Sequence, residues 1–448
     1  MSVTRSSRPT LFPAGDLHGP TGPPQDERAP YPRPVPGAAV PLPEARATAR
    51  AVGLAARLPA EPALLADAVG RVAAEAVTAR DRLPRFDASA MDGYALRAAD
   101  TEAASAARPA ALRIVDESRA GRGAGTVVRD GEAVRISTGA PIPTGADAVV
   151  RVEDTSADAR AVRVGVRVVA GHDVRRAGED VAPGTVVLPA GRVVRPATVG
   201  LLAGLGQASV AVVRRPSVVV VVTGDEVGVD AADPGPGMVR DVCGVVIPAL
   251  LLAAGAGAVR VARVGDDLDA TVDALGDAAA DVVVTTGGLS VGRHDHVRRA
   301  LATVGASERV TRVAARPGGP AWLGALDRDG ATTPVVGLPG NPAAAMVMAI
   351  LLAGPLLGAM AGGPPPTERR ARLVGATRRD GRRHRVLWGS LVPDDDGAPR
   401  VAPDALQQSH RLRPAADADV LAIVPPGDGP LDDGAVVEIV PVPGAALV

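Results

Sequence analysis

The sequence predicts a multidomain protein of the α/β plus β class, with a central α/β domain built on a parallel sheet, small β-rich domains and a C-terminal β-barrel-like domain. Three observations support this prediction. The chain of 448 residues is too long for one ordinary core. Between residues 216 and 363, apolar β-branched strands alternate with helical patterns, which is typical of a parallel sheet covered on both faces. On either side of this stretch, short Val-rich strands are broken by Gly and Pro, as in small β domains.

The N-terminal half begins with 43 residues that carry eleven prolines and predict a disordered or polyproline-like tail. Helices are expected at residues 42–58, opened by Pro43 and Glu44, and at residues 62–74. Residues 44–80 and 166–215 are predicted to form one split linker domain, in which 178–213 are short strands and turns. Residues 81–165, between these two segments, predict the β-rich domain.

The predicted α/β domain covers residues 216–363. Its expected strands are 217–222, 259–264, 281–285 and 334–337, and its expected helices are 245–254, 269–279 and 295–303. Ligands of such sheets bind beyond the carboxyl ends of the strands, so a site is expected in the loops that follow them. Prolines 364–366 make a stiff break, and residues 364–448 predict an all-β domain with at most one helix.

Composition excludes several classes of function. The net charge of -1 gives no argument for nucleic acid or an anionic membrane as a partner. Cys243 is the only cysteine, which excludes an intramolecular disulfide and a zinc site of several cysteines. No apolar run reaches the length of a membrane span without Gly, Pro or charge, and the N-terminus has no secretory apolar region. A cytoplasmic protein is therefore expected.

Residues 285–292, Thr-Thr-Gly-Gly-Leu-Ser-Val-Gly, follow the third strand of the predicted sheet. Three glycines with hydroxyl residues between a strand and a helix suit a phosphate, because backbone amides can approach an anion closely. No Lys follows, so this is not a Walker A loop. A glycine-rich turn without a ligand is the alternative.

Acidic residues gather at the same predicted edge of the sheet: Glu226, Asp241, Asp266, Asp267 and Asp295. Carboxylates that converge repel one another unless a cation joins them, and oxygen ligands beside phosphate fit a hydrated Mg²⁺. Each of these residues taken alone is more often a solvated loop or helix-cap residue, as in the turn 223–226.

Arg312 and Arg316 surround a short Val-Ala-Ala segment, and Arg316 opens the run Arg-Pro-Gly-Gly-Pro. The planar guanidinium suits oxyanions, although a solvated surface pair is the alternative. Asn341, the only Asn of the chain, follows the last strand and precedes a helix with Pro at its first position. A ligand contact and a structural turn explain Asn341 equally well.

Eight segments, in this order, resemble the MoeA-type molybdopterin molybdenumtransferases, the family that includes the gephyrin E domain. They are PRFDASAMDGYA, STGAPIPTGADAVV, RRAGEDVAPGTVVLPAG, VTGDEV, TTGGLSVGRHD, RPGGP, GLPGNP and, in the C-terminal part, QQSH. The resemblance implies an L-shaped homodimer of four-part subunits with a molybdopterin-binding α/β domain. It also implies the reaction, in which adenylylated molybdopterin and molybdate give molybdenum cofactor and AMP with Mg²⁺. A molybdopterin adenylyltransferase is then the expected upstream partner.

The resemblance also implies the site. Family positions carry over to the catalytic residues Asp92, Thr138, Glu226, Asp266 and Asp295, of which the last three would hold Mg²⁺. Asp92 and Thr138 would face the α/β domain of the other subunit. Substrate-binding positions are Gly287, Gly288, Ser290, Gly292, Arg312, Arg316, Asn341, Ser409 and His410.

Five positions depart from the family pattern. Two family Lys positions are Arg312 and Arg316, and a third is Gly319. Two family Asn positions are Cys243 and Ala88. The lost cation at Gly319 motivates an alternative function, a degenerate paralogue that binds molybdopterin or a partner without turnover. A second alternative, the adenylyltransferase that shares the TTGG loop, is disfavoured by the four-part length and the SAMDGYA segment.

Overall fold

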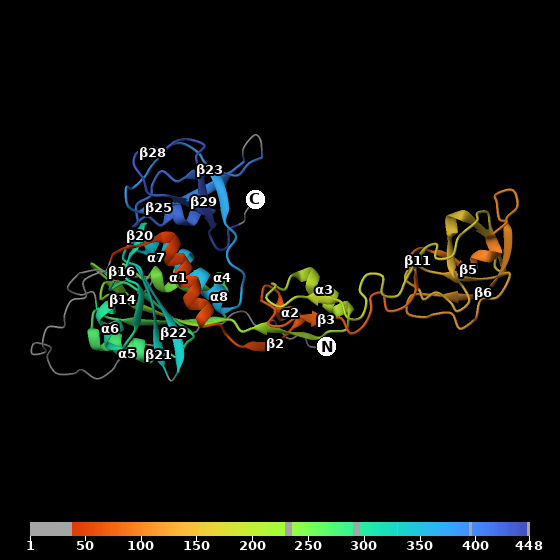
Figure 1. Ribbon diagram of the computed structural model, residues 1–448, viewed down its shortest axis with the longest axis horizontal. Helices are drawn as coiled ribbons and strands as arrows, with labels where there is room; N and C mark the ends of the chain where they lie inside the picture. Colours follow the sequence, from red (N-terminus) through yellow and green to blue (C-terminus); the bar gives the residue numbers. More distant parts are fainter. Residues whose placement is uncertain (1–37, 229–234, 290–295, 329, 394–396, 446–448) are drawn as a thin grey trace, which may run out of the picture. The chain divides into compact units, whose positions relative to one another are not determined.

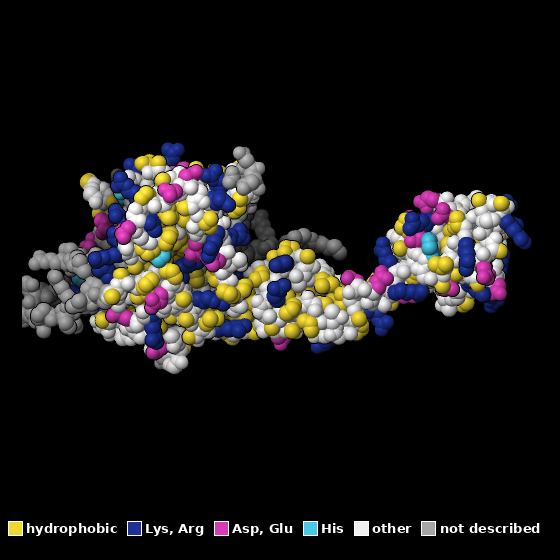
Figure 2. Space-filling model, turned by 45° about the horizontal axis from the view of Figure 1, so that its top comes forward, with side chains coloured by type: hydrophobic (Ala, Val, Ile, Leu, Met, Phe, Trp, Pro, Cys, Tyr) yellow, Lys and Arg dark blue, Asp and Glu magenta, His cyan; other side chains and the backbone are white. Residues whose placement is uncertain are grey.

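The computed structural model describes residues 38–228, 235–289, 296–328, 330–393 and 397–445. The chain forms two compact units, residues 1–61 with 212–448, and residues 62–211. Arginines and carboxylates are interspersed over the surface of both units, in keeping with the small net charge (Figure 2).

The first unit contains a six-stranded sheet in the order β17-β14-β18-β22-β21-β19. Its strands are β14 (Ser217–Thr223), β17 (Ala258–Val264), β18 (Val282–Thr286), β19 (Ser307–Val310), β21 (Trp322–Arg328) and β22 (Ala331–Leu338). The four strands β17, β14, β18 and β22 are parallel, as the sequence predicts. Strands β21 and β19 extend the sheet antiparallel at one edge, which the sequence analysis missed.

Helices cover both faces of this sheet (Figure 1). Alternate valines of β14 point to opposite faces, so that Val220 packs with one core and Val221 with the other. The first core includes α1 (Leu42–Ala55), α4 (Cys243–Ala253), α7 (Pro342–Met348), η3 (Ala349–Ala353) and α8 (Gly354–Met360). The second core includes α5 (Leu268–Gly276) and α6 (Val297–Thr303).

The helical run Pro342–Met360 is the one described helix that is long and apolar enough to cross a membrane, with a mean hydropathy of 2.1. In this structure 83% of it is buried. It packs against α1 and α4 in the first core, which is the environment of a central helix in a globular domain.

The C-terminal strands close into a small barrel, which confirms the predicted barrel-like domain. β25 pairs with both β26 and β27, and β23 and β29 complete the ring. The strands are β23 (Arg369–Leu373), β25 (His384–Val392), β26 (Arg400–Pro403), β27 (Val420–Val424) and β29 (Val436–Pro441), with β24 (Thr377–Arg378) paired to β28 (Pro430–Leu431) and one helix, α9 (Arg413–Asp417).

Strands β20 (Val313–Arg316) and β1 (Val40–Pro41) extend the barrel sheet from β25. β1 falls inside the predicted tail, whose expected end at residue 43 is therefore wrong. The reason is that Val40 and Pro41 pair with Val313 and Ala314, and Leu42, only 1% exposed, is part of the core.

Two truncations separate the tail from the structured residues that follow it. We expect removal of residues 1–37 to leave the melting temperature unchanged, because a Pro-rich segment buries little apolar surface. Removal of residues 1–43 should lower it, because burial of a Leu side chain contributes roughly 1.5–3 kcal/mol and Leu42 would be lost. Equal melting temperatures for the two truncations, measured by calorimetry, would contradict the pairing of β1.

The second unit contains a six-stranded sheet in the order β8-β5-β7-β6-β10-β9. Its strands are β5 (Gly93–Leu96), β6 (Ala110–Ser118), β7 (Glu132–Ile136), β8 (Ala148–Arg151), β9 (Thr155–Ala157) and β10 (Ala161–Val164). Two short ribbons pair β4 (Ala88–Ser89) with β11 (Val174–Arg175) and β3 (Val77–Thr78) with β12 (Val186–Leu188). The β-rich character predicted for residues 81–165 is confirmed by these strands.

The helix expected at residues 62–74 is wrong. Residues Ala60–Leu64 form strand β2 and only Leu65–Ala68 are helical, as α2. Gly70 has a φ of 78°, and the backbone of Ala73 bonds to Arg192, so the chain turns into strand-like pairing. Conversely, the segment expected to hold only strands and turns contains the helix α3 (Pro196–Gly204), besides β13 (Ser209–Val213).

Candidate functional site

Four loops meet at one edge of the α/β sheet. The register aligns Thr223 with Val264, Val222 with Thr286, and Thr286 with Leu338, so β14, β17, β18 and β22 end side by side. The carboxyl ends of parallel strands are where α/β sheets bind ligands. The loops that follow these strands, 224–226, 265–267, 287–289 and 339–341, therefore form the candidate site.

The direction of the chain changes between β14 and β18. From β14 the chain passes to β17 on one side, and then to β18 on the other side of β14. A crevice at such a switch point is the usual binding position. Here the switch point lies between the loops that follow Thr223 and Thr286, and the Thr223 hydroxyl donates a hydrogen bond to the carbonyl of Thr286 at 3.1 Å.

Glycine is required in the loop that follows β18, at the switch point of the sheet. Gly287 and Gly288 have φ angles of 88° and 59°. A Cβ atom on Gly287 would lie 2.7 Å from the Thr223 Oγ1, and one on Gly288 would lie 2.6 Å from the Val297 side chain. The loop can thus present only backbone here, packed closely against Thr223 and Val297.

The expected phosphate contacts are only partly available in this loop. The N–H of Gly287 donates to the carbonyl of Leu338 at 3.2 Å, so this amide is already used. Among the described residues the Gly288 N–H has no backbone partner. Ser290 and Gly292, the other predicted phosphate-binding positions, lie outside the described residues.

Two of the predicted catalytic carboxylates lie on adjacent loops of this edge. Asp266 follows β17 and Glu226 follows β14, and the Asp225 carboxylate joins the two loops by accepting the N–H of Asp266 at 2.9 Å. Within the described part of the chain, the carboxylates of Glu226 and Asp266 have no side-chain partner. They are free to bind a cation. Asp295, the third predicted Mg²⁺ ligand, lies outside the described residues, and the rest hold no group of three metal-ligand side chains.

Two other acidic residues of the predicted cluster have structural partners. Asp241 is 8% exposed, forms an ion pair with Arg263 at 2.8 Å and accepts the N–H of Gly244 at 2.6 Å at the start of α4. Asp267 is the N-cap of α5 and accepts the N–H of Ala270 at 2.8 Å. The cap alternative is therefore correct for Asp267, whereas Asp241 is held mainly by its ion pair with Arg263, one residue before Val242, the N-cap of α4.

Cys243 lies directly beneath the loops. Its thiol donates to the carbonyl of Gly340 at 3.8 Å. Burial, with a smaller contribution from the charge of Asp241, raises the pKa of the Cys243 thiol to about 12. The side chain is therefore a neutral thiol at physiological pH, which is neither a nucleophile nor a metal ligand in that state.

Arg312 and Arg316 stand on the turn that contains β20. Both side chains are exposed, and in the described ranges neither guanidinium has a hydrogen-bond or ion-pair partner. Register places Arg316 beside Arg385 of β25, and burial together with the charge of Arg316 lowers the pKa of Arg385. Arg385 was missed by the sequence analysis, because only the pairing of β20 with β25 reveals this third cation.

Asn341 and Ser409 come together although 68 residues separate them, since the Asn341 Nδ2 donates to the Ser409 Oγ at 3.3 Å. The Asn341 Oδ1 is buried without a partner among the described residues. Gln407 anchors the Ser409 segment by bonding the backbone of Trp388 at 3.1 Å and 2.9 Å. His410, the last predicted position, is exposed on this segment.

The second unit brings Asp92 and Thr138 together. Asp92 precedes β5 and Thr138 follows β7, and these strands are neighbours. The backbone N–H and the hydroxyl of Thr138 donate to the same oxygen of Asp92, at 2.7 Å and 3.1 Å. Both residues are exposed. The pair therefore forms a rigid polar surface feature.

Asp87, in the same family segment as Asp92, has a structural role. It accepts the N–H of Ala177 and a guanidinium hydrogen of Arg176, both at 2.8 Å. These bonds, first that of Ala177, lower the pKa of the Asp87 carboxyl. The two bonds join the segment at 84–95 to the segment at 175–191.

Comparison with known proteins agrees with these features. Three family models match the chain: the MoeA N-terminal region (domains I and II) over residues 40–206, a probable molybdopterin-binding domain over 219–359, and the MoeA C-terminal region (domain IV) over 370–442.

Similar proteins include the molybdopterin molybdenumtransferase 2 of Mycobacterium tuberculosis, 36% identical over 370 residues, with 81% of this chain and 90% of that protein covered. The molybdopterin molybdenumtransferase of Bacillus subtilis is 32% identical, with 84% and 88% covered.

Among solved structures, the molybdopterin biosynthesis MoeA protein of Pyrococcus horikoshii matches with a TM-score of 0.75 and 29% identity, covering 91% of this chain and 100% of that one. The matched segments, the loops at one sheet edge and these comparisons lead to one conclusion: the chain belongs to the MoeA family of molybdopterin molybdenumtransferases.

Proposed function

We propose that this protein inserts molybdate into adenylylated molybdopterin and releases AMP. The observation that carries the proposal is the set of groups at the sheet edge. Two carboxylates, Glu226 and Asp266, have no side-chain partner among the described residues and lie on the same sheet edge as Gly287, which admits only backbone. Arg312 and Arg316 supply unpaired cations, which suit an oxyanion.

The chemistry asks the protein for positioning and charge stabilisation rather than for a nucleophile. The reacting groups are the dithiolene sulfurs, the molybdate and the pyrophosphate bond of the substrates. Holding two reactants in place can lower a barrier by roughly 7–11 kcal/mol, and fixed charges stabilise the charge that develops as AMP leaves. The buried neutral thiol of Cys243 takes no part in this scheme.

A Mg²⁺ ion fits the residues that are described. Glu226 and Asp266 offer hard oxygen donors without a side-chain partner in the part of the chain that is described, and Mg²⁺ is commonly held by one or two carboxylates, substrate phosphates and waters. When bound, the ion would neutralise charge on the pyrophosphate. We propose Asp295 as a further ligand from its place in the sequence motif.

We further propose a cytoplasmic homodimer that receives its substrate from a molybdopterin adenylyltransferase. In that dimer, the Asp92–Thr138 pair of one subunit would complete the site on the α/β domain of the other. The family membership and the exposure of both side chains support this assignment.

The deciding experiment mixes purified protein with adenylylated molybdopterin, molybdate and Mg²⁺. We expect AMP release together with active cofactor, measured by reconstitution of a cofactor-free molybdenum enzyme. Binding of the adenylylated substrate without AMP release would favour the degenerate paralogue. Formation of adenylylated molybdopterin from ATP would favour the adenylyltransferase.

Two adjacent aspartates provide a test of the proposed metal site. We expect Asp266→Ala to abolish AMP release without a change in melting temperature, because a free carboxylate is lost. Asp267→Ala should lower stability by about 1 kcal/mol and keep activity, because it removes a helix cap. Asp295→Ala should behave like Asp266→Ala. Full activity of Asp266→Ala at ordinary Mg²⁺ concentration would rule out the metal role.

Gly319 offers a test of the oxyanion site by gain of function. Its φ is not in the left-handed region, and a Cβ atom would lie 3.5 Å from the nearest atom, the carbonyl oxygen of Ala315, an ordinary contact. The turn can therefore accept a side chain. A cation near an anion at a partly exposed position contributes on the order of 1 kcal/mol, so Gly319→Lys should lower the half-saturating molybdate concentration several-fold, most at low salt.

Gly319→Met is the matched control, since it adds a side chain of similar length without charge. Molybdate dependence of cofactor formation should be unchanged in that variant. If Gly319→Lys and Gly319→Met behave alike at low salt, the turn lies away from the oxyanion or Arg312 and Arg316 already saturate it.

A further inference from the structure

Arg298, near the start of α6, connects two loops of the site by three of its hydrogen bonds. Its Nε donates to the carbonyl of Leu289 at 2.7 Å. Its Nη2 donates to the carbonyl of Thr311 at 2.6 Å and, more weakly, to that of Pro320 at 3.3 Å. No sequence motif pointed to this residue.

The three acceptors hold particular places in the site. Leu289 ends the described part of the glycine-rich loop that starts with Gly287. Thr311 directly precedes Arg312 and Pro320 directly follows Gly319. The N–H of Val313 donates to the carbonyl of Gly319 at 3.0 Å and closes the turn between them. Arg298 thus forms hydrogen bonds to both ends of the turn that carries Arg312 and Arg316.

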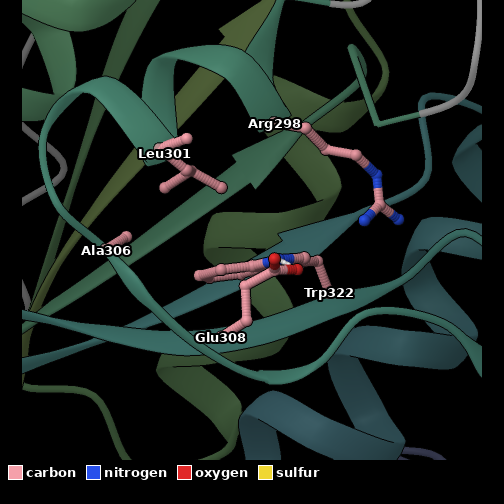
Figure 3. A pocket seen from close by; sticks show the side chains of 6 residues that line it. Arg298, Leu301, Ala306, Glu308 and Trp322 are labelled. Atoms are coloured by element: carbon pink, nitrogen blue, oxygen red, sulfur yellow. Dashed lines mark hydrogen bonds between the residues drawn. The ribbon is translucent and has the colours of Figure 1, made fainter. Parts of the chain in front are cut away.

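Packed side chains surround Arg298. It lines a small pocket with Leu301, Ala306, Glu308 and Trp322 (Figure 3). The Glu308 carboxylate accepts the indole N–H of Trp322 at 2.9 Å. The indole of Trp322 is only 2% exposed and packs beside the Arg298 side chain.

We infer that Arg298 is a positioning residue that fixes the turn bearing Arg312 and Arg316 relative to the glycine-rich loop. The oxyanion and the pyrophosphate group must lie at a set separation for the reaction, and a displacement of about 1 Å can cost roughly 100-fold in rate. The planar guanidinium suits carbonyls lying in different directions, which the compact ammonium of Lys matches less well. This inference rests on the proposed function.

The structure supplies a matched control in Arg328, at the end of β21. Arg328 also donates to two backbone carbonyls, those of Ala278 and Leu275. Because β21 runs antiparallel to β22, with Arg328 opposite Ala331, it lies at the other edge of the sheet. Removal of either guanidinium should lower the melting temperature, and only removal of Arg298 should disturb the site.

The test compares Arg298→Met, Arg298→Lys and Arg328→Met with the wild-type protein. We expect Arg298→Met to lower kcat at least tenfold per folded molecule and to raise the half-saturating molybdate concentration several-fold. Arg298→Lys should recover part of both losses. Arg328→Met should change neither quantity. Arg298→Met with the kinetics of Arg328→Met would overturn the inference.

A second arm measures molybdate binding by calorimetry, without turnover. Arg298→Met should bind molybdate several-fold more weakly than wild type, and Arg328→Met should bind it equally well. Wild-type protein that binds molybdate but forms no cofactor would refute the proposed function, and the binding comparison would still decide the role of Arg298. Equal binding by all variants would refute that role.

Discussion

Alanine at Gly287 is expected to reduce molybdenum cofactor formation by roughly 100-fold, since misplacement of a site by about 1 Å has effects of this size. The new Cβ would lie 2.7 Å from the Thr223 Oγ1 and 3.0 Å from the Thr223 carbonyl oxygen. The φ of 88° adds strain for any L-residue. The loop must then move away from β14, and the backbone at the switch point is displaced.

The matched control is Gly305→Ala. Gly305 also has a positive φ, 75°, and follows α6 in the same domain, but a Cβ atom there would meet nothing within 4 Å. It therefore carries the backbone strain without the collision. Initial rates of AMP release should separate the two variants while their melting temperatures stay close. Equal, near-normal rates for both would show that the loop beside Thr223 accommodates a Cβ atom and that the reaction does not depend on this glycine.

Removal of the Asp281 carboxylate is expected to destabilise the α/β domain by roughly 3 kcal/mol, the lower end of the range for breaking a buried ion pair, because this pair is only partly buried. Asp281 binds the guanidinium of Arg214 through both oxygens, at 2.6 Å and 2.8 Å, and its side chain is 18% exposed. It also accepts the backbone N–H and the hydroxyl of Ser217, at 2.8 Å and 2.6 Å. Asp281→Ala would leave these donors at the start of β14 without a partner.

This contribution should depend on pH in a definite direction. Burial acts to raise the pKa of Asp281, but the bonds to Arg214 and Ser217 outweigh it and the folded-state pKa is lowered. The carboxylate therefore stabilises the fold fully above the unfolded pKa of about 4, and this stabilisation is lost as the pH falls below that value.

Urea unfolding of wild type and Asp281→Ala at pH 7 and below pH 4 measures this effect. The difference between the two proteins should be large at pH 7 and should shrink at the lower pH. Asp277→Ala, an exposed carboxylate at the end of α5, is the control and should have little effect at either pH. If the difference in unfolding free energy between wild type and Asp281→Ala does not change with pH, packing and not charge stabilises the contacts of Asp281.

Predictions from the sequence were most accurate for segments whose conformation is determined by their own residues. The Val run of β14 is apolar at every position because both of its faces are covered, and this appears in the sequence as a continuous strand. Glycines in the loop at 287–288 mark positive φ angles that other residues avoid. Strand ends predicted in this way place Glu226, Asp266 and Gly287 on one edge, and the structure confirms that placement.

Local pattern failed where a partner distant in the sequence decides the conformation. The Ala-rich run at 62–74 has helical composition, but bonds to residues near 192 hold part of it in an extended conformation. Strand β1 lies in the segment predicted to be a disordered tail, because nothing within residues 38–43 indicates that Val313 is its pairing partner.

By itself, the sequence determined the fold class, the order of the loops and the family, because these depend on burial periodicity, on turn chemistry and on motifs read along the chain. Only the tertiary structure decided which acidic residue does what. Asp241, Asp267 and Asp281 are engaged by Arg263, a helix end and Arg214, whereas the Asp266 carboxylate has no side-chain partner in the described ranges. It also decided that Arg298 links two loops of the site. A side chain's role depends on which donors surround it in space, and those donors lie tens of residues away along the chain.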